Sequence, residues 1–118
     1  MYTIPEIFDT TLLENRIVEQ VCFSINTISL HLGLDTYIRI EGEYIVESNN
    51  LQKMYSVYPL TNDNYILKLL ECKIDRVIVH EDRRNLTLTF SNKTNITLIG
   101  NELYESYFLK TKEMEILI

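Results

Sequence analysis

Histidine is the first residue type to consider for chemistry, because imidazole exchanges a proton near neutral pH. His80 precedes Glu81 and Asp82, and a histidine beside carboxylates can serve in general acid–base catalysis. The only other histidine, His31, lies far from it in the sequence. The chain offers no serine or cysteine in a glycine-framed turn to act as a nucleophile, and no glycine-rich phosphate loop. We therefore expect both histidines to lie on the surface near turns, and we expect no enzymatic activity.

Carboxylates form the second group of candidate residues, and most gather at corresponding places in the two halves of the chain. The group consists of Asp35, Glu41, Glu43, Glu47, Glu102 and Glu105. Their spacing lacks the regular ligand pattern of a calcium loop, and Cys22 and Cys72 form no zinc-ligand motif. We therefore expect no metal and no cofactor. The carboxylates fit either an acidic face for a basic protein partner or an ordinary solvated strand face.

Tyrosine is in excess, with eight residues against four phenylalanines and no tryptophan. Several of these tyrosines flank the acidic stretches, among them Tyr44 and Tyr104. A tyrosine ring offers broad amphipathic contact area and is enriched in protein interfaces, although half-buried packing is the common alternative in β-rich chains. We predict that the six carboxylates, together with Tyr44 and Tyr104, form a protein-binding surface.

The net charge of −6 and the isoelectric point near 4.9 argue against nucleic acid or an anionic membrane as direct partners. They favour a cationic partner, or simply solubility. No stretch approaches the ~18 apolar residues of a membrane span. The first ten residues carry Glu6 and Asp9 and no basic residue, so they do not resemble a secretory signal. We expect a cytoplasmic protein.

The elements that must position these side chains come in two similar sets. Residues Ile28, Leu30, Leu32, Thr36, Ile38, Ile40 and Gly42 match Leu86, Leu88, Phe90, Thr94, Ile96, Leu98 and Gly100 at a nearly constant offset. The repeat spans about residues 12–47 and 69–109. Because one supersecondary unit used twice usually buries a common core between its copies, we expect a single domain over residues 1–118.

Alternation of apolar and polar residues within each copy predicts antiparallel strands with one buried face. We expect one or two short helices, over residues 12–15 and 65–70, with Thr61 or Asn62 as the cap of the second. Residues 51–57 read as loosely helical or irregular, and the apolar end over residues 114–118 is expected to dock as a strand or to cover an edge.

The resulting fold class is α+β, mainly antiparallel β, with two β-meander units that share one core and form a barrel or a sandwich. We expect the two copies to be related by a pseudo-two-fold axis. The predicted core consists of Leu30, Leu32, Ile38, Ile40, Leu88, Phe90, Ile96 and Leu98.

The run from Ile28 to Gly42 resembles the first half of a family of small bacterial β-rich domains without assigned chemistry. The runs 69–74 and 85–100 resemble its second half, and Tyr104-Glu105-Ser106-Tyr107 resembles its closing aromatic motif. Domains of this kind occur as immunity proteins beside polymorphic toxins, including contact-dependent growth inhibition systems. The resemblance implies a cytoplasmic antitoxin that neutralises a cognate toxin by binding it, and it supplies no catalytic residue.

Many delivered toxins are nucleases, which need basic clefts to hold phosphates, and an acidic tyrosine-rich protein can occupy such a cleft. The alternative is a small-molecule-binding barrel or sandwich without catalysis, with a ligand held in an interior lined by Tyr and Cys. An enzyme that uses His80 is the weakest hypothesis. The sequence leaves the oligomeric state open.

Overall fold

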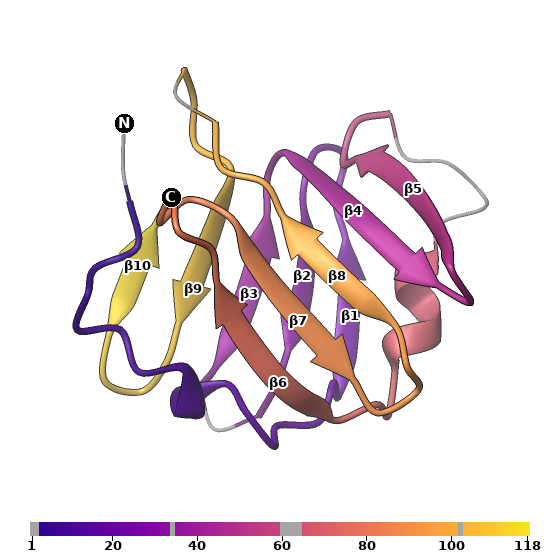
Figure 1. Cartoon of the computed structure of the whole chain (residues 1–118), viewed down its shortest axis with the longest axis horizontal. Helices are drawn as coiled ribbons and strands as arrows, with labels where there is room; N and C mark the ends of the chain where they lie inside the picture. Colours follow the sequence, from indigo (N-terminus) through magenta and orange to yellow (C-terminus); the bar gives the residue numbers. More distant parts are fainter. Residues whose placement is uncertain (1–2, 34, 60–64, 102) are drawn as a thin grey trace.

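The computed structural model describes residues 3–33, 35–59, 65–101 and 103–118. Within these residues, ten strands form two five-stranded antiparallel sheets that lie one over the other (Figure 1). Sheet A contains, in spatial order, β1 (Gln20–Phe23), β2 (Ile28–His31), β3 (Tyr37–Ile40), β9 (Tyr107–Lys110) and β10 (Glu115–Leu117). Sheet B contains β5 (Leu51–Ser56), β4 (Glu43–Ser48), β8 (Asn95–Leu98), β7 (Leu86–Phe90) and β6 (Ile74–Val79).

The expected predominance of antiparallel β structure is confirmed. The sheets do not close into a barrel, because each keeps two edge strands, and they are arranged as in a β-sandwich. The helical part of the expected α+β class amounts, in the described residues, to two 3-10 helices, η1 (Thr10–Leu12) and η2 (Tyr65–Leu69). None of the helices described there is long and apolar enough to cross a membrane.

The core lies between the two sheets. All eight predicted core residues are at most 2% exposed, so this prediction is confirmed. Alternation explains the result: in β2 and β7 every second residue is buried, and the same holds in β3 and β8. Both sheets therefore contribute matching apolar rows to one core.

The chain crosses between the sheets twice. The meander β1–β2–β3 lies in sheet A, and the chain then enters sheet B as the hairpin β4–β5. The meander β6–β7–β8 lies in sheet B, and the chain returns to sheet A as β9–β10. Each sheet is thus completed by a hairpin from the other half of the chain, through the pairs β3–β9 and β4–β8. The internal repeat itself stays a prediction.

The segment expected to be irregular is a strand, so that expectation was wrong. Asn49 and Asn50 have φ values of 53° and 64°, as a two-residue type I′ hairpin turn requires, and β5 then pairs with β4 over six residues. Almost all of β5 is exposed, so its sequence carries no alternation that would have revealed a strand.

Two further predictions concern the C-terminus and the helix over residues 65–70. The apolar C-terminus docks as β10 on β9, as expected. The predicted helix over residues 65–70 is the 3-10 helix η2, whereas its expected caps, Thr61 and Asn62, lie outside the described residues.

We expect Ile38→Ala and Leu88→Ala each to lower the free energy of unfolding by about 2–5 kcal/mol. Both side chains are 0% exposed, so truncation removes buried apolar surface and leaves a cavity. Urea denaturation measures the loss. Leu51→Ala is the matched control, because Leu51 is 76% exposed and its truncation should change stability by no more than about 0.5 kcal/mol. Equal effects of buried and exposed truncations would contradict the assigned core.

Candidate functional site

The connection between β8 and β9 projects beyond the sheets at one end of the molecule (Figure 1). Its tip presents Leu103, which is 88% exposed, and Tyr104, which is 53% exposed. Hydrogen bonds within the loop support this tip: the backbone N–H of Asn101 donates to Ser106 Oγ at 2.8 Å, and the N–H of Leu103 donates to Asn101 Oδ1 at 2.8 Å. The loop is therefore a braced projection with an apolar tip.

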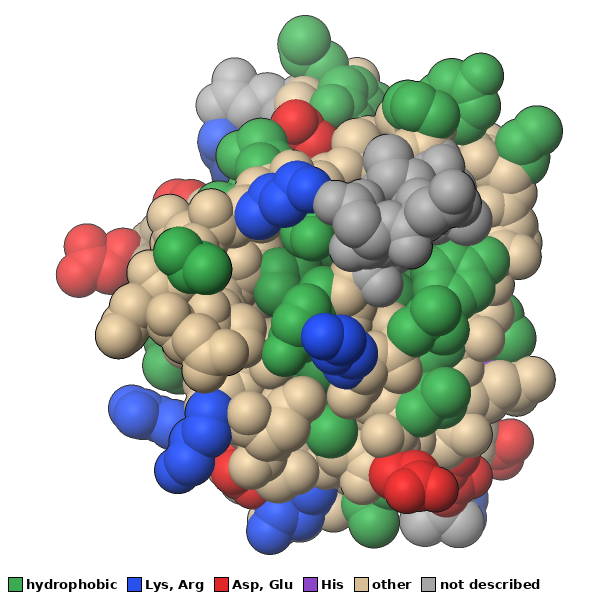
Figure 2. All heavy atoms as spheres, turned by 90° about the vertical axis from the view of Figure 1, so that its right-hand side faces the viewer, with side chains coloured by type: hydrophobic (Ala, Val, Ile, Leu, Met, Phe, Trp, Pro, Cys, Tyr) green, Lys and Arg blue, Asp and Glu red, His purple; other side chains and the backbone are tan. Residues whose placement is uncertain are grey.

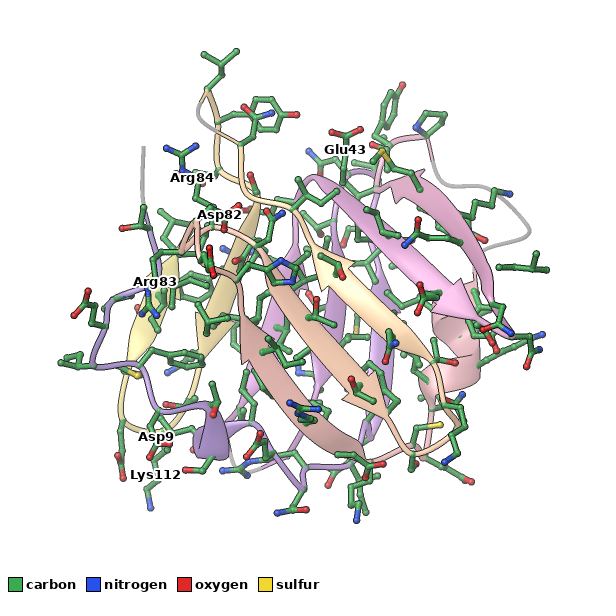
Figure 3. All side chains as sticks on the ribbon, viewed as in Figure 1. Asp9, Glu43, Asp82, Arg83, Arg84 and Lys112 are labelled. Atoms are coloured by element: carbon green, nitrogen blue, oxygen red, sulfur yellow. The ribbon has the colours of Figure 1, made fainter. Side chains whose placement is uncertain are left out.

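The bend that carries the chain from β3 to β4 lies against the base of this loop. The N–H of Glu41 donates to the carbonyl oxygen of Ser106 at 2.8 Å, and a Cβ added at Gly42 would lie 3.5 Å from Ser106 Cα. Glu43 is half-buried and starts β4 at the same end of the molecule (Figure 3). Glu105 is exposed and precedes Ser106.

We call this surface the loop end and define it by Glu41, Glu43, Leu103, Tyr104 and Glu105. The structure thus brings three of the six predicted carboxylates and one of the two predicted tyrosines to the same end of the molecule, where Glu41 lies against Arg39 on the outer side of sheet A and Glu43 faces outward from sheet B. Glu102 lies outside the described residues.

The three carboxylates of the loop end differ in their surroundings. Glu41 Oε1 lies 3.3 Å from Arg39 Nε, and the guanidinium of Arg39 lies 4.8 Å from the ring centroid of Phe108. Among the described residues, no group donates a hydrogen bond to the buried Oε2 atom of Glu41. Arg39 therefore offsets much of the negative charge of Glu41, and we expect Glu43 and Glu105 to contribute more of the potential that an approaching partner meets.

Two predicted carboxylates lie elsewhere. Asp35 is exposed in the turn before β3, whereas Glu41 follows β3, so the two residues are at opposite ends of that strand. Glu47 is on the outer side of sheet B, where its carboxylate accepts hydrogen bonds from Asn95 Nδ2 at 3.2 Å and Gln52 Nε2 at 3.4 Å. These two residues do not form one surface with the loop end.

Tyr44 requires a correction, because its side chain is 0% exposed. Alternation along β4 turns Tyr44 and Val46 into the core while Glu43 and Glu47 face outward. The ring of Tyr44 stacks on that of Tyr55 with centroids 5.5 Å apart. It therefore has no exposed surface to offer a partner. Conversely, sequence reasoning missed Leu103, whose only signal is an apolar residue within a polar, non-alternating run.

The base of the loop is fixed by Tyr107 and Gly100. The hydroxyl of Tyr107, which is fully buried, donates to the backbone carbonyl of Arg84, and burial raises the pKa of this hydroxyl far above its ordinary value. At the other end of the loop, a Cβ added at Gly100 would lie 2.7 Å from the same carbonyl oxygen. Both ends of the loop therefore pack against Arg84, which requires glycine at position 100.

The side chains of His80 and Asp82, the weakest of the candidate groups for chemistry, both make hydrogen bonds with residues of the β6–β7 hairpin and its turn. His80 Nε2 lies 2.7 Å from Thr87 Oγ1, and the side chain is half-buried. The carboxylate of Asp82 accepts hydrogen bonds from the backbone N–H groups of Arg84 at 2.9 Å and Asn85 at 3.0 Å, which lower its pKa. Asp82 therefore closes the turn between β6 and β7. In the described part of the chain, no group of three or more His, Cys, Asp or Glu residues is placed to hold a metal ion.

A surface hollow of about 950 Å³ lies away from the loop end, on the outer face of sheet A beside the turn that contains Asp35. Its lining includes Glu19, His31, Asp35, Tyr37, Lys110 and Lys112. The rings of His31 and Tyr37 are neighbours there, with centroids 5.5 Å apart. The hollow thus carries both signs of charge around two aromatic rings.

Comparisons of the chain with protein-family models, with curated proteins and with solved structures found no match.

We expect Tyr107→Phe to lower the free energy of unfolding by about 1–3 kcal/mol, because the carbonyl of Arg84 loses its hydrogen-bond donor. The raised pKa of Tyr107 also predicts a pH effect. The unfolded chain releases this proton near pH 10, before the folded chain does, so wild-type stability falls as the pH rises above about 10.

Urea denaturation between about pH 8 and pH 11 tests the effect, and the fall should be smaller in Tyr107→Phe. Tyr104→Phe is the control: this tyrosine is 53% exposed, so the variant should keep the wild-type pH dependence. Identical pH dependence in both variants would show that Tyr107 is not the titrating group.

Proposed function

We propose that the protein is a non-catalytic immunity protein that binds a cognate bacterial toxin domain through the loop end and thereby blocks it. The observation that supports the proposal most is that two exposed side chains, Leu103 and Tyr104, project on one loop with Glu105, at the end of the molecule where Glu43 begins β4. A protein interface of moderate size usually has such a composition, with apolar or aromatic anchors surrounded by charged groups.

The chemistry of this surface favours a cationic partner. The carboxylates of the loop end, within a chain of net charge −6, would attract a basic surface and raise the rate of association. A basic cleft that holds phosphates, as in a nuclease, is a surface of this kind. The projecting tip would enter the cleft and exclude the substrate. Inhibition would then be steric and electrostatic, without turnover, and would take place in the cytoplasm with the toxin.

The family resemblance supports the same assignment. The closing motif, Tyr104-Glu105-Ser106-Tyr107, forms the second half of the projecting loop and the start of β9. Ser106 and Tyr107 are buried and hold the loop base, whereas Tyr104 and Glu105 are exposed. The motif would therefore combine two structural residues with two contact residues.

If the gene immediately upstream encodes the cognate toxin domain, as the proposal requires, we expect Glu43→Lys and Glu105→Lys to slow association with that domain. Each reversal adds repulsion where a basic partner approaches, so the association rate should fall severalfold at low salt, and the difference should shrink as salt rises. Asp35→Lys is the matched control, because it makes the same charge change at the other end of β3. Stopped-flow kinetics across salt concentrations decides the matter. Equal slowing by all three reversals would show that the overall charge of the protein, rather than the loop end, governs the association rate.

We expect Leu103→Ala and Tyr104→Ala to act on dissociation instead. An anchor buried in a complex typically contributes at least ~1.4 kcal/mol, which corresponds to about tenfold faster dissociation on truncation. Ile25→Ala is the control, because Ile25 is 79% exposed in the turn between β1 and β2. Surface plasmon resonance with the immobilised toxin domain measures the rates. Unchanged dissociation in both loop variants would exclude the tip from the interface.

The hollow on sheet A favours a second candidate function, which is binding of a small molecule without catalysis. Core side chains occupy the space between the sheets, so a ligand would bind on the outer face rather than in an interior lined by Tyr and Cys. Lys110 and Lys112 would meet an anionic group there, beside the ring of Tyr37. A ligand found by thermal-shift screening that fails to stabilise Lys110→Glu yet still stabilises Leu103→Ala would favour this function.

A further inference from the structure

The four edge strands of the two sheets are not equally protected. The N–H of Val77 in the edge strand β6 donates to Glu14 Oε2 at 3.1 Å, and the N–H of Asn15 donates to the carbonyl of Ile74 at 2.7 Å. A register shift follows Ile74 in the same strand. These features cover and distort the β6 edge. In sheet A, the edge strands β1 and β10 have only four and three residues. The remaining edge strand, β5, has six residues.

The outer edge of β5 presents a regular row of backbone groups. Because Asn49 and Asn50 form a two-residue turn, the flanking pair Ser48–Leu51 exchanges hydrogen bonds, and such pairs then alternate along the hairpin. Leu51, Lys53 and Tyr55 therefore bond to β4. The N–H and C=O groups of Gln52, Met54 and Ser56 point to the other side, where no strand within the described residues pairs with them.

The side chains of β5 do little to discourage pairing. Leu51 is 76% exposed and Met54 is 54% exposed, and Figure 2 shows hydrophobic side chains gathered on the side of the molecule where β5 and η2 lie. Although the chain has a net charge of −6, β5 contains no Asp or Glu. Its one charged residue, Lys53, has its ammonium nitrogen 5.0 Å from the ring centroid of Tyr55. Long edge strands usually carry inward charges, proline or a bulge that prevents association.

We propose that β5 pairs with β5 of a second copy of this chain, antiparallel and about a two-fold axis at Met54, so that the two B sheets become one continuous sheet. In this register the outward-pointing residues pair with each other: Met54 faces Met54 of the second copy, and Gln52 faces Ser56. Lys53 then lies opposite Tyr55 of the second copy, so the cation meets an aromatic ring and no like charge. The absence of carboxylates on β5 favours a second copy as the occupant, because this is where two acidic chains can approach with least repulsion.

Disulfide trapping tests the register. Facing Met54 residues would have Cα atoms about 5.5 Å apart, within the range of roughly 4.4–6.8 Å that a disulfide spans. Met54→Cys should therefore form a covalent dimer under mild oxidation. Gln52→Cys is the matched control, because four residues of offset at ~3.4 Å each separate the two thiols too far. Wild type reports any cross-linking through Cys22 and Cys72, which are free thiols. Equal cross-linking of both variants, or of neither, overturns the proposal.

Sedimentation of unmodified chains tests the pairing itself. Wild type and Met54→Leu should dimerise alike. Met54→Pro should weaken the dimer at least tenfold, because proline has no backbone N–H to donate to the second copy, while the hydrogen bonds between β5 and β4 do not involve this N–H. Circular dichroism tests whether Met54→Pro is folded. If it is not, the comparison of Met54→Cys with Gln52→Cys decides whether β5 pairs with a second copy. A wild-type chain that stays monomeric at high concentration overturns the proposal. So does a Met54→Cys chain that cross-links to the toxin domain instead of to itself. Leu103→Ala and Tyr104→Ala lie outside β5 and its partner strand β4, so they should dimerise normally, which separates this test from that of the proposed function.

Discussion

The pairing of β3 with β9 and of β4 with β8 is the interaction on which the rest of the structure depends. These two ladders join the halves of the chain, because each half leaves its own sheet after three strands and adds a hairpin to the other sheet. The same crossings close the core: Ile38 pairs with Leu109 in sheet A, and Val46 pairs with Ile96 in sheet B. Removal of either hairpin would therefore shorten a sheet and uncover apolar side chains that belong to the other half.

The crossings also explain how the loop end arises. The first crossing bends at Gly42, and the second passes through the loop that carries Leu103 and Tyr104. Because both crossings occur at the same end of the sandwich, the backbone of Glu41 bonds to that of Ser106. Residues that are distant in sequence thus form one surface. The loop lies outside both sheets and is held at its base through Arg84. The apolar side chains at its tip are therefore exposed and are not part of the core.

The two proposed interfaces differ in their physical basis. At the loop end, side chains would supply the recognition, and charge would govern the rate of association. At β5, backbone groups would supply it, and the strand register would determine which residues meet. The two surfaces also differ in charge, since the loop end contains carboxylates and β5 has none. A dimer joined through β5 would leave the projecting loops of both copies available for other contacts.

Local pattern alone was sufficient to identify the eight predicted core residues. Period-two alternation in strands such as β2 and β7 marks the buried face directly, and the apolar C-terminus indicates that it must dock. Alternation fails for β5, because a strand exposed on both faces leaves no periodic signal. It also cannot tell which sheet a strand joins after a bend, so the place of Tyr44 in the core and the separation of Asp35 from Glu43 were decided by tertiary structure. Burial is encoded residue by residue along one strand, whereas the neighbours of a surface residue depend on pairing between strands that are distant in the chain.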